Sequence, residues 1–77
     1  MATPAPAPEV LVVDDDEGLL ILMAEALRAD GCEVATAGTA QAARAWLEHR
    51  TPELMILDLK LPDGSGPALV AELQRDR

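Results

Sequence analysis

Two short apolar segments, each followed by aspartate, most strongly limit how this chain can fold. Residues 10–13 read VLVV and precede Asp14 and Asp15. Residues 53–57 read ELMIL and precede Asp58. Short continuous apolar runs bounded by polar residues are typical of strands buried on both faces, which occur in parallel sheets covered by helices. Both segments are therefore predicted to be strands of one such sheet.

The segment after the first acids has the spacing of an amphipathic helix. Asp16 or a neighbouring acid can cap its start, Glu17 adds charge to its first turn, and Gly31 is a suitable stop. Within residues 18–30, four apolar side chains lie at i, i+3, i+4 and i+7, which is one face of a helix: Leu20, Met23, Ala24 and Leu27.

The remaining segments continue the alternation of strand and helix. Residues 32–37 predict a strand near a sheet edge, and Thr39 is a candidate N-cap for a helix over 40–50. Residues 67–77 predict a third helix. The order predicts an α/β fold with a parallel sheet. Inner faces are expected at Ala42, Ala43, Trp46 and Leu47 in the second helix and at Leu69, Val70 and Leu73 in the third.

Composition limits both the core and the partners. The 77 residues form one small domain, and with no Phe or Tyr and one Trp its core must be aliphatic. A net charge of −8 argues against nucleic acid and anionic membranes as partners of this chain.

No apolar run is long enough to span a bilayer, and the single Cys32, expected to be partly buried, gives no sign of an oxidising compartment. A cytoplasmic location is predicted. Residues 1–8, rich in Ala and Pro, are predicted to be a disordered leader, with the domain covering 9–77.

The aspartates that follow the two apolar strands are expected to converge. All strands of a parallel sheet end at the same edge, where open α/β sheets bind their ligands. Asp14, Asp15 and Asp58 would therefore lie within a few ångströms of one another. Carboxylates so close need a cation between them or raised pKa values. A site of hard oxygen ligands with room for water suits Mg²⁺.

Residues 9–77 resemble the receiver domains of two-component response regulators. The resemblance rests on VLVVDDDEGLL at 10–20, on LMILDLKLPDGSG at 54–66 and on the spacing between them. It implies a partial flavodoxin-like fold, with three parallel strands in the order 2-1-3 and helices on both faces. Complete receivers have five βα units, so it also implies a receiver truncated within the third helix, with family strands 4 and 5 absent.

The resemblance also implies roles for individual residues. Asp58 would be the phosphoacceptor, which takes a phosphoryl group from a phosphohistidine on a sensor histidine kinase or a histidine phosphotransfer protein. Pro62 and residues 64–66 would shape the loop that follows. The Mg²⁺ ligands would be Asp14 through water, Asp15, Asp58 and the backbone carbonyl of Lys60.

The chain also departs from the family pattern. The family's Ser or Thr follows strand 4 and has no counterpart, because that strand is expected to be absent. The family's Lys after strand 5 has none either, because Lys60 is the only lysine. Loss of a cationic group from a phosphoryl site can remove several kcal/mol of transition-state stabilisation. The strand at 53–57 would have an unpaired apolar edge and the first helix an apolar patch, which predicts dimer formation or aggregation.

Three classes of function remain open from the sequence. The first is a phosphoacceptor module in a phosphorelay. The second is a fragment that binds a kinase or phosphotransfer partner through the first helix without being phosphorylated. The third is a haloacid-dehalogenase-like phosphohydrolase, which needs a second Asp at the position of Lys60. Other polar residues have simpler interpretations: His49 is expected to be a cation near a helix end, and Asp63 a turn residue.

Overall fold

A parallel three-stranded sheet between two layers of helices forms the body of the molecule. The computed structural model describes residues 7–75. Its sheet consists of β1 (Glu9–Val13), β2 (Glu33–Ala37) and β3 (Leu54–Leu57), in the order β2-β1-β3 with both pairs parallel. The predicted α/β class and strand order are confirmed, and β2 lies at an edge as expected. No further strand joins this sheet within residues 7–75.

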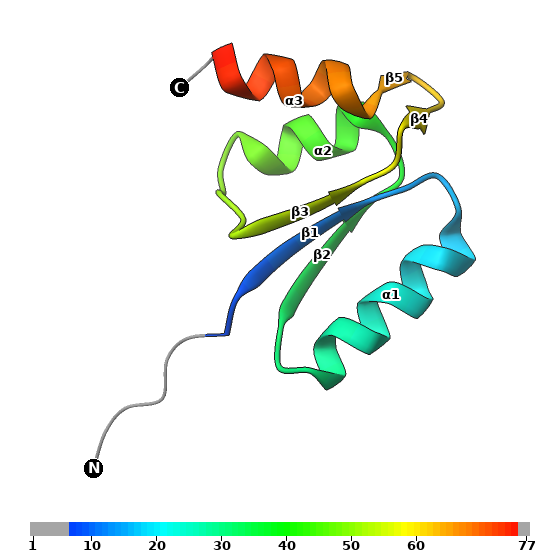
Figure 1. Cartoon of the computed structure of the whole chain (residues 1–77), viewed down its shortest axis with the longest axis vertical. Coiled ribbons are helices and arrows are strands. Elements are labelled where there is room, and N and C mark those ends of the chain that lie inside the picture. Colours follow the sequence, from blue (N-terminus) through cyan, green and yellow to red (C-terminus); the bar gives the residue numbers. More distant parts are fainter. Residues whose placement is uncertain (1–6, 76–77) are drawn as a thin grey trace.

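Helices cover both faces of the sheet. Helix α1 (Glu17–Ala29) lies on one face, while α2 (Ala40–Leu47) and α3 (Gly66–Arg75) lie side by side on the other (Figure 1). Helix α2 was expected to reach residue 50 but ends at Leu47, where the Glu48 N–H closes the last turn on Arg44. The predicted end of α3 at 76–77 and most of the predicted leader, residues 1–6, lie outside the described residues.

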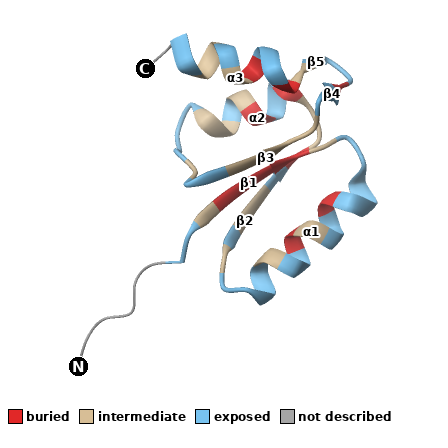
Figure 2. Ribbon diagram, viewed as in Figure 1, coloured by how far each residue is buried: buried red, intermediate tan, exposed pale blue. Residues whose placement is uncertain are grey.

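The side chains of β1 alternate between the two helical layers. Leu11 and Val13 point to the layer of α2 and α3, and Val10 and Val12 to that of α1. All four are at most 2% exposed, which explains the continuous apolar run (Figure 2). The buried partners in the first cluster are Ala37, Ala40, Ala43, Leu61 and Leu69, and in the second Leu20.

Local capping fixes where α1 and α2 begin. Asp16 accepts a hydrogen bond from the Leu19 N–H at 3.1 Å, and Thr39 accepts one from the Ala42 N–H at 3.0 Å. Both side chains satisfy donors that a helix start leaves free. Gly31 follows α1 with a φ of 91°, a conformation that favours glycine. The predicted caps and stop are confirmed.

The predicted inner face of α2 was partly wrong. Ala43 is buried and Trp46 and Leu47 are partly buried against the core, but Ala42 is exposed. The buried stripe starts at Ala40, and Ala42 lies about 200° around the helix from it. The inner faces predicted for α1 and α3 are buried or partly buried as expected.

The segment between β3 and α3 is a small hairpin rather than the plain loop expected from the sequence. Strands β4 (Lys60–Leu61) and β5 (Gly64–Ser65) pair antiparallel, with Pro62 and Asp63 in the turn. Leu61 is buried in the core and anchors the hairpin there. These two short strands form a separate sheet and do not extend the parallel one.

Several large apolar side chains remain exposed. On α1 they are Leu19, Ile21 and Leu22, and around β3 they are Leu54 and Leu59. Within the described residues, β3 pairs only with β1, so its outer edge is open. The apolar edge expected at the strand over 53–57 and the exposed apolar side chains expected on the first helix are thus present. No helix among the described residues is long and apolar enough to cross a membrane.

Candidate functional site

Backbone hydrogen bonds place two aspartates at the carboxyl edge of the sheet. The Asp14 N–H donates to the Ala37 carbonyl at 3.0 Å, and the Asp58 N–H donates to the Val13 carbonyl at 2.9 Å. Each bond continues a strand ladder one residue beyond the strand. The main chain of both aspartates is therefore fixed by the sheet itself.

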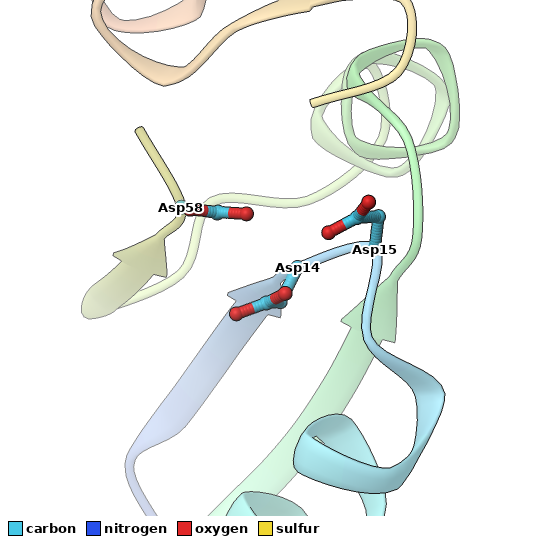
Figure 3. A group of neighbouring side chains, drawn as sticks. All are labelled: Asp14, Asp15 and Asp58. Carbon is cyan, nitrogen blue, oxygen red and sulfur yellow. The ribbon is translucent and has the colours of Figure 1, made fainter. Parts of the chain in front are cut away.

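The three aspartates singled out in the sequence come together at this edge. One carboxylate oxygen from each of Asp14, Asp15 and Asp58 lies within 4.8 Å of the other two. The Asp58 side chain extends across the end of β1 toward that of Asp15 (Figure 3). Asp14 and Asp58 are half-buried and Asp15 is exposed. Within residues 7–75 no other group of three side chains has such a ligand geometry.

Local hydrogen bonds orient two of these carboxylates. Asp14 Oδ1 accepts from the Asp16 N–H at 3.0 Å, and Asp58 Oδ1 accepts from the Lys60 N–H at 3.4 Å. An ionised carboxylate has about four acceptor positions, so each keeps oxygen lone pairs for another ligand. The side chains are held in place without being saturated.

The donor set fits a hard divalent cation. All three side-chain ligands are carboxylate oxygens, which Mg²⁺ prefers, and the open side next to Asp15 leaves room for water ligands. A cation would also offset the mutual repulsion of three negative charges. Lys60 lies two residues after Asp58 and its side chain is exposed. Its carbonyl as a further ligand stays a prediction.

Gly66 closes the base of the hairpin against Asp58. A Cβ atom at this position would overlap the Asp58 carbonyl oxygen and lie 3.0 Å from Leu57 Cγ. The Gly66 N–H donates to the Leu59 carbonyl at 3.3 Å. Only a residue without a side chain lets α3 start this close to the end of β3.

Asp63 has a role that its prediction as a turn residue did not include. Its Oδ1 accepts from the Ala40 N–H at 2.7 Å and its Oδ2 from the Gln41 N–H at 2.9 Å. These two bonds lower the pKa of Asp63 from its ordinary value. The partners are 22 and 23 residues away in the chain. No local pattern signals such a contact.

A bidentate ion pair links the two helices on this face. Arg44 of α2 donates from Nε and from its second terminal nitrogen to the Glu72 carboxylate of α3, at 2.7 and 2.9 Å. The hydrogen bond from Arg44 holds the pKa of Glu72 below its ordinary value. The pair is partly exposed, so it contributes to the alignment of the helices more than to stability.

The opposite end of the sheet contains a hollow, but among residues 7–75 it holds no comparable group of metal ligands. A cavity of about 420 Å³ there is lined by residues that include Arg28, Trp46 and Arg50. The Arg50 guanidinium lies 6.0 Å from the centroid of the Trp46 ring. His49 is exposed just beyond α2. Chemistry rather than volume therefore selects the aspartate cluster as the candidate site.

Comparison with known proteins identifies the family. A family model described as the response regulator receiver domain matches residues 10–77. The chain belongs to this family. Receiver domains are phosphoacceptor modules of two-component phosphorelay signalling, and they bind Mg²⁺ at an acidic site and interact with histidine kinases or phosphotransfer partners.

Curated relatives of this receiver chain are regulatory proteins of bacteria. RegA of Rhodobacter capsulatus, a photosynthetic apparatus regulatory protein, is 35% identical over 68 residues, which cover 88% of the chain and 37% of RegA. PrrA of Mycobacterium tuberculosis, a transcriptional regulatory protein, is 41% identical over 75 residues, which cover 96% of the chain and 32% of PrrA. The chain thus spans about a third of the length of these relatives.

Solved receiver structures share the fold. The response regulator TrrA of Thermotoga maritima, crystallised in complex with Mg²⁺ and BeF, superposes with a TM-score of 0.85 at 30% identity, over 91% of this chain and 61% of that one. A CheY-like receiver domain of Methanospirillum hungatei gives a TM-score of 0.87 at 34% identity, over 92% and 57%. The order β2-β1-β3 is therefore a receiver arrangement.

Proposed function

We propose that this receiver chain accepts a phosphoryl group on Asp58 from a phosphohistidine, with Mg²⁺ held by Asp14, Asp15, Asp58 and the Lys60 carbonyl. The observation that carries the proposal is the approach of three carboxylate oxygens to within 4.8 Å of one another at the carboxyl edge of the sheet. Two of the three belong to segments whose backbone the sheet ladder fixes.

The transfer step needs a positioned nucleophile and neutralised charge. An Asp58 carboxylate oxygen attacks phosphorus, the P–N bond to the donor imidazole breaks, and its electron pair stays on the imidazole nitrogen. The product is an acyl phosphate. The transition state spreads negative charge over three equatorial oxygens, and bound Mg²⁺ supplies the neutralisation that lets a phosphoryl group approach carboxylates.

The chain's own residues orient the nucleophile. The Lys60 N–H approaches Oδ1 of Asp58, which favours Oδ2 as the attacking atom. The Asp58 N–H bond to the Val13 carbonyl fixes the Cα position beside β1. The Asp16 N–H holds the Asp14 carboxylate, so that it need not reorganise when a cation binds.

The proposed partner is a sensor histidine kinase or a histidine phosphotransfer protein, and a cytoplasmic location belongs to the same proposal. A net charge of −8 argues against direct binding of nucleic acid or anionic membranes by this chain. The open outer edge of β3 is where a dimer would form.

A second candidate function is binding without phosphorylation. Ile21 and Leu22 on α1 are 61% and 68% exposed, and such side chains are a surface for an apolar partner. This function predicts partner binding that Asp58→Asn leaves unchanged.

Phosphoryl acceptance is tested by incubating the folded chain with acetyl phosphate and Mg²⁺ and measuring its intact mass. A gain of one phosphoryl group is expected in the unmodified chain and in Asp30→Asn, an exposed control outside the cluster. Asp58→Asn should show none. No gain in an unmodified chain whose circular dichroism shows a folded state would reject acceptance and leave the binding function.

A further inference from the structure

Asp63 connects the hairpin that follows Asp58 with the start of α2. It lies in the turn of the β4–β5 hairpin, and its two oxygens accept from the first two N–H groups of α2, Ala40 and Gln41. Thr39 separately caps the Ala42 N–H from within its own segment. The start of α2 thus has one local cap and one long-range cap.

The hairpin that carries Asp63 also carries a predicted metal ligand. Lys60 is the first residue of β4, and its N–H approaches Asp58 Oδ1. Gly66 lies close to the backbone carbonyl of Asp58 and so holds the base of the hairpin against it. The turn at Asp63 is the end of the hairpin farthest from Gly66. Its contact with α2 therefore restrains the free end.

The other side of the contact leads back to Asp14. Helix α2 begins three residues after Ala37, whose carbonyl accepts from the Asp14 N–H. A Cβ at the intervening Gly38 would lie 3.9 Å from the Asp14 carbonyl oxygen. The two bonds of Asp63 therefore join the hairpin after β3 to the segment that packs on the end of β1.

We propose that Asp63 is a positioning residue, which clamps the β4–β5 hairpin onto α2 so that the Lys60 carbonyl and Asp58 stay aligned with Asp14 and Asp15 for Mg²⁺. The inference rests on the proposed function in its choice of metal and ligands. It adds a residue outside the ligand set. Removing a group that orients metal ligands commonly weakens metal binding about tenfold or more.

The test compares two caps of the same helix. Asp63→Ala removes the clamp, whereas Thr39→Ala removes the local cap and leaves the hairpin attached. Calorimetric titration with Mg²⁺ is expected to give a dissociation constant about tenfold higher for Asp63→Ala and an unchanged one for Thr39→Ala. Asp63→Asn, which keeps one acceptor oxygen, should be intermediate and serves if Asp63→Ala does not fold.

Phosphorylation by acetyl phosphate gives the second measurement. In Asp63→Ala the half-saturating Mg²⁺ concentration should rise, and the rate at saturating Mg²⁺ should approach that of the unmodified chain. Equal Mg²⁺ affinities in all folded variants, or equal losses in Asp63→Ala and Thr39→Ala, would overturn the positioning role. If the Mg²⁺ affinities differ as predicted but the chain takes up no phosphate, phosphoryl acceptance on Asp58 is rejected and the positioning role of Asp63 stands. An unmodified chain that binds no Mg²⁺ would overturn both.

Discussion

Strands β1 and β3 have similar sequences and are each followed by aspartate, yet their burial differs greatly. Val10 of β1 and Leu54 of β3 are direct partners in the parallel ladder and share one face of the sheet. Val10 is 2% exposed and Leu54 is 54% exposed. The difference arises because β1 lies between two strands, whereas β3 is at an edge that α1 does not cover (Figures 1 and 2).

The apolar-then-Asp pattern determines where the aspartate lies, whereas the neighbouring elements determine how deeply the strand is buried. In both strands the pattern places an aspartate at the carboxyl edge, where the ladder fixes its backbone. Burial of the preceding residues depends on which elements pack beside the strand. The site therefore depends on the strand ends, and stability depends mainly on β1.

Matched Leu→Ala substitutions in the two strands should show the largest contrast. Leu11→Ala removes a fully buried side chain and should lower the free energy of unfolding by about 2–5 kcal/mol. Leu54→Ala removes a half-exposed side chain and should change it by about 0.5 kcal/mol or less. Urea unfolding followed by the fluorescence of Trp46 measures both. Similar losses in the two variants would contradict the contrast.

Glycine substitutions test how tightly the end of β3 is packed. Gly66→Ala places a Cβ against the Asp58 carbonyl oxygen, and the forced shift should cost about 1–3 kcal/mol. Gly64→Ala is the matched control in the same hairpin, because its Cβ would lie an ordinary 3.7 Å from Ala40 Cβ. Urea midpoints are expected to fall only for Gly66→Ala. A Gly66→Ala variant as stable as the unmodified chain would show that the hairpin base is loose.

The smallest effect is expected at the end of β1. Asp15 is exposed, and Asp15→Asn removes one of the three clustered charges. Without Mg²⁺ the variant should be slightly more stable, by less than about 1 kcal/mol, because repulsion is reduced. Added Mg²⁺ should raise the thermal midpoint of the unmodified chain more than that of the variant. Equal responses to Mg²⁺ in melts followed by circular dichroism would exclude Asp15 as a ligand.

Sequence reasoning was most reliable where the deciding interactions are local. The apolar strands and the caps at Asp16 and Thr39 follow from patterns a few residues long. The meeting of the aspartates joins distant residues, but it follows from two such strands ending at the same edge of a parallel sheet. Ala42 was placed wrongly although the start of α2 was predicted correctly, because alanines lie all around this helix and their positions alone do not show which side packs on the sheet. The contact of Asp63 with α2 joins residues more than twenty apart, so only the folded chain brings it to light.

Locating the phosphoryl group tests acceptance on Asp58 most directly. The chain is treated with acetyl phosphate and Mg²⁺, the acyl phosphate is reduced to the stable alcohol with borohydride, and the modified residue is identified by peptide mass spectrometry. Modification is expected at Asp58 alone. Modification at Asp14 or Asp15 instead would contradict the assignment of Asp58 as the acceptor.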